Sequence, residues 1–398
     1  MRKYSKRYPN NWLHGQNIGK ILTLAGYGGF AGSGKIMKNN LRSVLSAVAL
    51  GSVLMAPNGF AQSANPSDVA DLTGPQFNLM GFGDISYISR DAGDPGGFAV
   101  GQAVAHLTAS LDDSFRVFAE FSMTATDNGY NAGVERMIVR YDFSDLFKLS
   151  AGRYHSPIGY WNSAFHHGAW LQTTVSRPEM VKFGSKIVPI HFVGALLEGT
   201  LPRNRLGLSY MVGFGNGRHE NIAQAGDTGD INGDNAWMVQ LNAAPYRYYG
   251  LRTGIGIYSD VVSPDDRPDI NEQTISAYIA WAKESPEIIM EYIYSSHDLV
   301  VDSSASGNVN AWYAQFAYRL KGRLNKWKPY ARFEKSEVDD SDPLLGDQGL
   351  NYDAAIFGAR WDFNPYAALK AEYRNEDFDN SGRENNFRLQ VSFVLAKL

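Results

Sequence analysis

The sequence predicts an all-β protein, a transmembrane antiparallel β-barrel of about 16 strands. Three observations predict this fold. Short runs of alternating apolar and polar residues follow Pro75, polar connections of unequal length separate them, and no later apolar run reaches the roughly 20 residues of a spanning helix. Aromatic residues make up 13% of the 398 residues, and Gly and Asn crowd the breaks, as expected of strands joined by turns.

The N-terminal residues have the order of an export signal. Lys38 and Arg42 precede an uncharged apolar run at 43–56, and Pro57 and small residues follow. We expect cleavage after Ala61 or Ala64. The chain then divides into an upstream extension (1–36), a secretory signal peptide (37–61), an N-terminal periplasmic segment (62–75) and the barrel (76–398).

One Gly-rich stretch of the extension has two interpretations, a nucleotide-binding loop and a flexible leader. Gly29, Gly34 and Lys35 have the spacing of a phosphate loop, but Ile36 occupies the position of the hydroxyl that binds magnesium. No acidic residue precedes Asp68. We interpret the stretch as a flexible leader and expect no cofactor.

Composition excludes several classes of function. Eight of the 37 Lys and Arg residues lie in the first 67 positions, which leaves 29 against 41 acidic residues. The exported part is therefore acidic, which argues against nucleic-acid binding. Because the chain has no cysteine, it has no disulfides, no thiolate metal site and no cysteine nucleophile.

The alternating runs have the length of tilted membrane-crossing strands. They lie at 76–90, 98–111, 114–126, 133–143, 147–156, 189–201, 205–215, 236–244, 248–260, 271–283, 286–297, 309–320, 327–338, 351–363, 367–376 and 386–397.

The connections between the runs are expected to alternate in length along the chain. "DDS" after Leu111 and "NPY" after Phe363 are short, whereas "DDSDPLLGDQGL" is long. Short turns are typical of the periplasmic end of an outer-membrane barrel, and long loops of its outer end. An even strand count places both chain ends in the periplasm.

Alternation within each run predicts which face meets lipid. In "SFRVFAEFSMT", Phe121 and Met123 share one face, and Glu120 and Ser122 share the other. We expect the apolar face outside and the polar face inside. A soluble sandwich would show the same alternation, but rarely over so many runs without helices.

A barrel of 16 strands leaves an aqueous channel, so the wall residues indicate what passes. The alternation places twelve cations toward the lumen: Arg116, Arg136, Arg140, Lys148, Arg252, Arg319, Lys328, Arg332, Arg360, Lys370, Arg374 and Arg388. Seven acids join them: Glu120, Asp142, Glu291, Glu334, Asp353, Asp362 and Glu372. Such a basic wall favours anions. Alternatively, these residues pair across strands and only stiffen the wall.

The third long connection, "PIGYWNSAFHHGAWLQTTVSRPEMVKFGSKIV", is expected to fold into the lumen. Long irregular loops are usually functional, and this one is aromatic-rich with few acids. We predict that it constricts the channel through Tyr160, Trp161, His166, His167, Arg177, Lys182 and Lys186. Alternatively, it is a plug with an aromatic core and no role in passage.

Metal binding and catalysis find little support. Neighbouring His166 and His167 point apart on extended chain, and no acid has a matching spacing. His106 and Ser110 share a strand face, but four residues at about 3.3 Å rise separate them too widely for a hydrogen bond. We expect no metal and no enzyme activity.

"LSAGRYHSPIGYWN", Leu149 to Asn162, resembles the stretch that enters the third loop in the phosphate- and polyphosphate-selective porins of Gram-negative outer membranes. The resemblance implies a 16-stranded barrel, a homotrimer, and passive diffusion of small anions such as phosphate. It also implies outer-membrane lipid, lipopolysaccharide and the barrel-assembly machinery as partners. The alternative function is a non-conducting barrel that acts as a surface or adhesion protein through its long loops.

Overall fold

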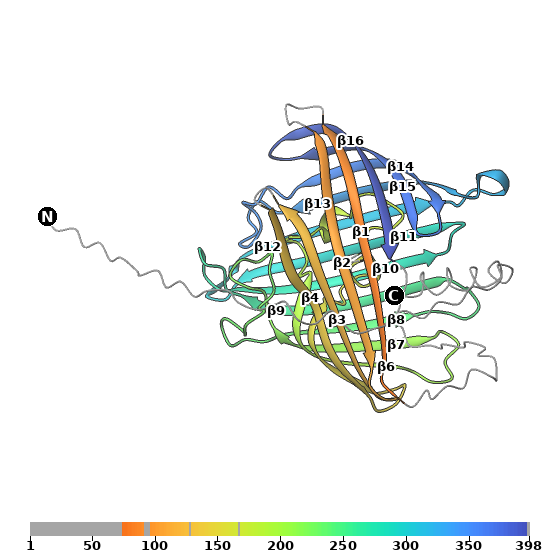
Figure 1. Cartoon of the computed structure of the whole chain (residues 1–398). Helices are drawn as coiled ribbons and strands as arrows, with labels where there is room; N and C mark the ends of the chain where they lie inside the picture. The colour runs from red at the N-terminus through yellow and green to blue at the C-terminus, as the bar shows by residue number, and fades with distance from the viewer. Residues whose placement is uncertain (1–73, 91–95, 127–128, 166–167, 396–398) are drawn as a thin grey trace, which may run out of the picture. The chain divides into compact units, whose positions relative to one another are not determined.

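Sixteen β-strands make up most of the residues that the structure describes (Figure 1). The computed structural model describes residues 74–90, 96–126, 129–165 and 168–395, all within the compact unit Leu45–Leu398. The predicted extension and signal peptide lie outside these residues. The strands are β1 (Gln76–Arg90), β2 (Gly97–Ser110), β3 (Phe115–Thr126), β4 (Gly129–Asp142), β5 (Lys148–His155), β6 (His191–Thr200), β7 (Leu208–Asn216), β8 (Ala236–Ala243), β9 (Leu251–Val262), β10 (Ile270–Ala282), β11 (Glu287–Leu299), β12 (Asp302–Ala317), β13 (Trp327–Val338), β14 (Tyr352–Asn364), β15 (Ala367–Phe378) and β16 (Gly382–Leu395).

The strands form one closed antiparallel ring. Each strand pairs with its neighbours in the chain, and β16 returns to β1 with Gly81 opposite Leu395 and Arg90 opposite Asn386. A closed ring has no edge strand, so the backbone N–H and C=O groups of the strands bond to neighbouring strands, as hydrocarbon requires. Each predicted run matches one strand, and the predicted transmembrane β-barrel is confirmed.

Side chains alternate between the two faces of the ring as predicted. Ile257 on β9 lies opposite Ile275 on β10, and both are exposed. The next pair, Tyr258 opposite Thr274, is buried. Exposed apolar side chains cover the outer face of other strands as well: Phe121, Phe214, Leu241, Met290, Phe316, Phe333 and Phe357.

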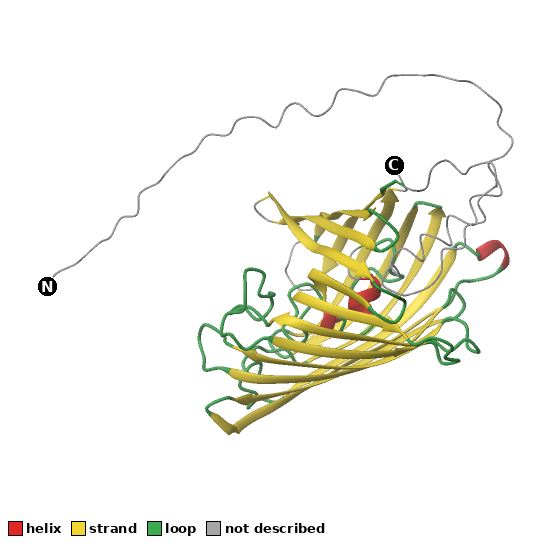
Figure 2. Cartoon of the chain, turned by 90° about the horizontal axis from the view of Figure 1, so that it is seen from below, coloured by secondary structure: helices red, strands yellow, loops and turns green. Residues whose placement is uncertain are grey.

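Among the described residues, helical structure is confined to short segments. These are α2 (Trp161–Phe165) and the 3-10 turns η1 (Glu179–Val181) and η2 (Gly322–Leu324). No helix among the described residues has the length and hydropathy of a membrane span. Both α2 and η1 belong to residues 156–190 between β5 and β6, which we call the third loop. Figure 2 shows red helical turns within the ring of strands.

One end of the barrel, the short-turn end, carries the connections that follow the even-numbered strands. They range from two residues (365–366) to nine (318–326). Gln76 and Leu395, the first and last residues of the ring, lie at this end too.

The opposite end is less regular than predicted. The connections 156–190, 217–235 and 339–351 are long, but 300–301 and 379–381 contain only two and three residues. Regular alternation of connection length is therefore wrong at these hairpins. The physical reason is that polar residues continue the strand ladders: Asp298 lies opposite Ser306, and Asp377 opposite Arg383.

Replacing Ile257 by Arg tests the outer face. A charged side chain on the lipid face near the bilayer midplane costs about 2–4 kcal/mol, and we expect a loss of this size in the free energy of unfolding. Val301→Arg, at the exposed turn 300–301, is the control and should change stability by less than about 0.5 kcal/mol. Denaturant titration in phospholipid vesicles measures both. Equal effects would argue against a hydrocarbon-facing surface at Ile257.

Candidate functional site

The third loop leaves the barrel wall through a closed neck. The Ser156 N–H donates to the Ile190 carbonyl at 2.8 Å. The side-chain amide of Asn162 donates to the carbonyls of Ser156 and Ile190, at 2.8 and 2.9 Å. Ser156 and Asn162 are fully buried. The two ends of the loop are therefore tied together, and the residues between them are free to contact other strands.

The first turn of the loop is held by Glu291 of β11. Its carboxylate accepts the N–H groups of Tyr160 and Trp161, each at 2.7 Å. Gly159 makes this approach possible: its φ is +76°, and a Cβ there would lie 2.2 Å from a Glu291 oxygen. The Trp161 ring then packs edge-on against Tyr313, with centroids 5.9 Å apart.

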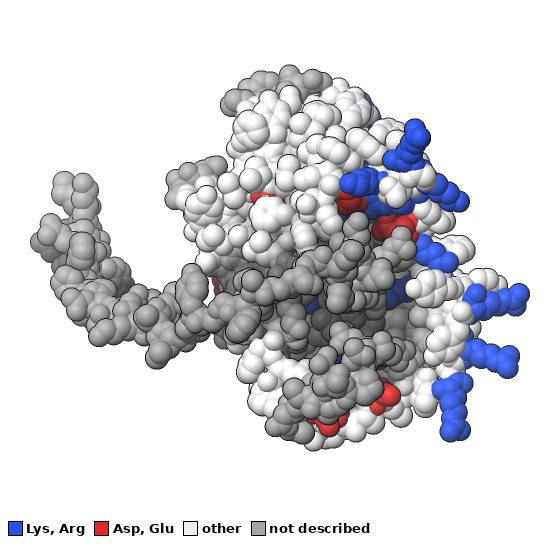
Figure 3. All heavy atoms as spheres, turned by 45° about the vertical axis from the view of Figure 1, so that its right-hand side comes forward, with Lys and Arg blue, Asp and Glu red and all other residues white. Residues whose placement is uncertain are grey.

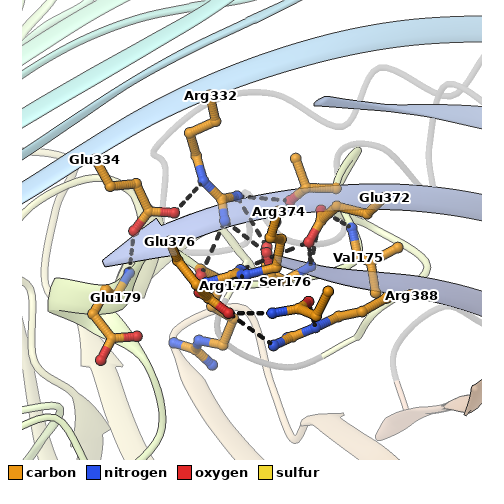
Figure 4. A network of polar contacts seen from close by, with 12 residues as sticks. Val175, Ser176, Arg177, Glu179, Arg332, Glu334, Glu372, Arg374, Glu376 and Arg388 are labelled. Atoms are coloured by element: carbon orange, nitrogen blue, oxygen red, sulfur yellow. Dashed lines mark hydrogen bonds and ion pairs between the residues drawn. The ribbon is translucent and has the colours of Figure 1, made fainter. Parts of the chain in front are cut away.

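A second carboxylate, Glu372 of β15, binds the middle of the loop (Figure 4). It accepts the N–H groups of Val175 and Ser176 at 3.0 and 3.2 Å, and the Tyr330 hydroxyl donates to it at 2.9 Å. Glu372 is fully buried. A buried carboxylate is stable only when it accepts such hydrogen bonds or pairs with a cation.

Arg332 of β13 supplies the opposite charge beside it. Its guanidinium donates to the Ser176 carbonyl at 3.0 Å, to the Ser176 hydroxyl at 2.8 Å and to the Arg177 carbonyl at 3.1 Å. Its Nε donates to Glu334 at 2.7 Å, and Glu334 also accepts the Glu179 N–H. The wall thus satisfies both donors and acceptors of the loop backbone at 175–179.

Two more cations bind the carbonyl groups that precede this stretch. Arg360 of β14 donates to the carbonyls of Trp170 and Gln172 at 2.6 and 2.9 Å. Lys370 of β15 donates to the Thr174 carbonyl at 3.0 Å and to the Ala169 carbonyl. Strands β11, β13, β14 and β15 therefore all contact the third loop through charged side chains.

Most wall cations are matched by carboxylates. Arg136 pairs with Glu120, Arg140 with Glu198 at 2.7 Å, and Lys328 with Glu287 at 2.8 Å. Pairs of this kind rigidify the wall and cancel much of its field. Other pairs are Arg116–Asp142, Arg319–Glu284, Arg332–Glu334, Arg360–Asp362, Arg374–Glu376 and Arg388–Glu376.

The predicted excess of cations on the wall is wrong, because the set of acids predicted to face the lumen is incorrect. Asp353 lies on the outer, exposed face, where it pairs with Arg383. The alternation misassigns Asp353 because its neighbours on the inner face, Tyr352, Ala354 and Ile356, are apolar yet buried, so the two faces of this strand do not differ in polarity. The count also omitted acids that are buried with the wall residues: Glu198, Asp260, Glu272, Glu287 and Glu376.

Among the described residues, Lys370 also binds no carboxylate, but loop carbonyls satisfy its ammonium group, whereas Arg252 of β9 has neither kind of partner. Arg252 lies opposite Ala280 and shares its face with buried Tyr258. Within the described part of the chain, it forms no hydrogen bond or ion pair. Two rings lie near this stretch of wall, Tyr278 on β10 and Tyr160 of the third loop, with centroids 5.4 Å apart.

The predicted constriction residues have separate partners. Arg177 lies over the Phe183 ring at 4.0 Å and donates to the Val181 carbonyl. Lys182 pairs with Glu179, and burial raises the pKa of that Glu179 carboxyl above its ordinary value although Lys182 opposes the shift.

The remaining members of the predicted set are divided between described and undescribed residues. Lys186 donates to Gln348. Tyr160 and Trp161 are buried at the Glu291 contact. His166 and His167 lie outside the described residues.

Sequence reasoning missed Arg218, a buried residue of the polar connection 217–235. Its guanidinium binds Glu272 at 2.7 Å and the carbonyls of Lys186 and Ile187 at 2.7 and 3.2 Å. Arg218 therefore fastens the far end of the third loop to β10. Nothing local distinguishes it from the exposed charges around it.

Other chemistry finds no support in the described residues. His106 lies 2.8 Å from Glu120, across the β2–β3 ladder, and so belongs to the wall network. The described part of the chain holds no group of three or more His, Cys, Asp or Glu residues arranged for a metal ion.

No family model and no curated protein matches this sequence. Solved structures do match. The anion-selective porin from Comamonas acidovorans has a TM-score of 0.56 and 10% identity, over 81% of this chain and 100% of that chain. Salmonella typhi OmpF, in complex with daunomycin, has a TM-score of 0.55 and 12% identity, over 81% of this chain and 98% of that chain. The trimer form of OmpT, an outer membrane protein of Vibrio cholerae, has a TM-score of 0.53 and 13% identity, over 81% of this chain and 100% of that chain. The chain therefore has the fold of outer-membrane porins.

Glu372→Ala tests whether the wall holds the third loop in place. Removing one member of a buried charge network costs about 3–5 kcal/mol. We expect faster hydrogen exchange at the N–H groups of Val175 and Ser176, and tryptic cleavage after Lys182 in the folded barrel. Glu337→Ala, which removes an exposed partner of Lys335, is the control and should alter neither. Unchanged exchange at 175–176 in Glu372→Ala would show that other contacts fix the loop.

Proposed function

We propose that the protein is a passive channel for small hydrophilic solutes in a Gram-negative outer membrane. The observation that carries the proposal is the contrast between the two faces of a closed 16-strand ring. Apolar side chains cover the outside, and charged and polar side chains occupy the inside. A ring of this size is wide enough for water when its interior is not fully packed.

The third loop is the constriction in this proposal. It contacts the wall on four strands besides its own hairpin, so it narrows the passage across much of its width. Its backbone is tied by Glu291, Arg332 and Glu372. Because these contacts are buried and charge-matched, the constriction is rigid rather than a mobile gate.

A modest preference for anions follows from Arg252. Wall pairs such as Arg140–Glu198 carry little net charge, whereas Arg252 has no carboxylate bound to it within the described residues. A single cation in a low-dielectric passage attracts anions and repels cations. Dense rows of unpaired Arg and Lys are lacking on the described wall, so we propose general anion preference, with phosphate as one of several solutes.

Export and assembly complete the proposal. The signal peptide at 37–61 directs the chain through the inner membrane, and the barrel-assembly machinery inserts it among lipid and lipopolysaccharide. We propose a homotrimer, the form in which the Vibrio cholerae protein of the same fold is described.

A non-conducting barrel is the second candidate, and the third loop favours it. Trp161, Val181 and Val188 are fully buried, so part of the loop packs as a core rather than lining water. In this case, the loop is a plug, and the outer loops carry the function.

Single-channel recording in planar bilayers separates the two candidates. The channel predicts stepwise currents from the unmodified protein. The plug predicts silence from the unmodified protein and currents only when Glu372→Ala loosens the loop. Silence from both proteins, each shown to be folded, would reject passage through this barrel.

Arg252→Glu tests the source of ion preference. In a potassium chloride gradient, we expect the reversal potential of the unmodified channel to indicate chloride preference. The substitution should shift the permeability ratio toward potassium by about fivefold or more, because it reverses a wall charge that binds no carboxylate among the described residues. Lys335→Glu, on the exposed outer face, is the control and should leave the ratio unchanged. An unchanged ratio in Arg252→Glu would remove this residue from the selectivity mechanism.

A further inference from the structure

The short-turn end carries an unbalanced set of cations on one side. Four successive connections at this end, 201–207, 244–250, 283–286 and 318–326, join β6 through β13. They contain eight cations, of which Arg319 is paired with Glu284. The other seven we call the basic arc: Arg203, Arg205, Arg247, Lys283, Lys321, Arg323 and Lys326. Figure 3 shows Lys and Arg side chains gathered along one side of the molecule.

The basic arc is continuous because neighbouring turns are hydrogen bonded to each other. The Tyr246 N–H donates to the Arg205 carbonyl at 3.3 Å, and the Ala282 N–H to the Gly250 carbonyl at 3.0 Å. The Arg319 N–H donates to the Glu284 carbonyl. The cations are thus held side by side on a fixed backbone rather than on independent loops.

The positive charge of the arc is not neutralised locally. The four turns contain one carboxylate, Glu284, and Arg319 and Lys328 already bind it at 2.8 and 3.4 Å. Burial alone would raise the pKa of Glu284, but Lys328 and Arg319 outweigh it and lower the pKa to about 2. No member of the basic arc forms an ion pair with any described residue. Acidic turn residues lie elsewhere on the same rim: Asp112, Asp113 and Asp145.

Aromatic and aliphatic side chains lie among these cations. Tyr246, Tyr248 and Tyr249 are exposed in the turn 244–250, as are Leu206 and Leu324 in other turns of the arc. The Arg247 guanidinium lies 5.8 Å from the Tyr248 ring, and the Lys283 ammonium 5.3 Å from the Tyr249 ring. Exposed tyrosines beside basic residues are typical of the headgroup level of a bilayer.

The position of the basic arc along the barrel axis agrees with the headgroup level of a bilayer. Leu251 lies opposite Trp281 at the start of β9, and the lipid-facing residues Ile255 and Ile279 lie a few positions further along these strands. Lys283 and Arg247 follow within a few residues on the other side. The arc therefore begins where the apolar outer band ends, within reach of lipid phosphates.

We propose that the basic arc binds the phosphodiester headgroups of anionic phospholipids in the leaflet that meets the short turns. Clusters of four to eight Lys and Arg at a membrane surface typically bind anionic lipid. The exposed Tyr and Leu side chains favour a lipid surface over a soluble acidic partner, because they contact acyl chains beside the headgroup. One sector of the barrel would then recruit acidic lipid, and the sector with Asp112, Asp113 and Asp145 would not. The proposal does not depend on whether the barrel conducts.

Tryptophan quenching by brominated lipids tests this proposal on the full-length barrel. Trp281, Trp327 and Trp361 lie at the short-turn end and report on nearby lipid. The probes are brominated phosphatidylglycerol and brominated phosphatidylcholine in vesicles at low and high salt. We expect phosphatidylglycerol to bind about fivefold or more tightly at low salt, and this ratio to fall as salt screens the charges.

Matched variants locate the effect on the arc. Arg205→Gln with Arg247→Gln should reduce the preference severalfold, and replacing all seven arc cations by Gln should bring the ratio close to one. The control variant, Lys335→Gln with Arg383→Gln, removes the same charge as Arg205→Gln with Arg247→Gln. Its two residues lie toward the end of the barrel opposite the short turns, so it should leave the ratio unchanged. Each variant must retain β-rich circular dichroism.

Three results would overturn the proposal. The first is equal binding of the two lipids by the unmodified protein, which is measured without any substitution. The second is a preference that persists in a folded barrel lacking all seven cations. A preference lost equally in the control pair would also reject the arc, because it would reflect net charge alone.

Discussion

Closure of the hydrogen-bond ladder between β1 and β16 allows every strand of this protein to lie in lipid. Hydrocarbon offers no partner for backbone N–H and C=O groups, so a sheet can lie in lipid only when it has no edge. The pairing of Gly81 with Leu395 also places the first and last strand residues of the ring on the same side of the membrane, at the short-turn end. Closure separates the two faces of every strand, and that separation permits an apolar exterior together with an ionisable interior.

The ionisable interior is organised around the third loop. Glu372 and Arg332 are fully buried, and each is stable there because the loop backbone supplies the hydrogen bonds that water would otherwise provide. The loop in turn has few strand-like bonds of its own and relies on the wall. Loop and wall therefore form one polar network, in which most charges are matched and Arg252 is not. This arrangement connects the rigidity of the loop with the modest selectivity proposed for the channel.

The exterior is organised differently, because lipid rather than protein surrounds it. Exposed Ile257 and Phe316 lie in the apolar band, and the turns beyond that band carry the charges. Those charges are distributed unevenly around the rim, with cations at the turns between β6 and β13 and acids at Asp112, Asp113 and Asp145. A transmembrane ring thus has two chemically distinct sectors at one membrane surface.

The amino-acid sequence was sufficient to predict the strands, their number and the face of most residues, because a period of two residues is local and lipid imposes it on every strand. It also singled out the third loop by its length and composition. The three-dimensional fold alone fixes which charged groups find partners, since Arg332 and Ser176 lie 156 positions apart in the chain, and Glu372 and Val175 lie 197 apart. It placed Asp353 outside, where buried apolar neighbours had hidden the alternation, and brought Arg218 to Glu272. Alternation is a property of single strands, whereas pairing depends on how the closed ring brings distant strands and the loop together.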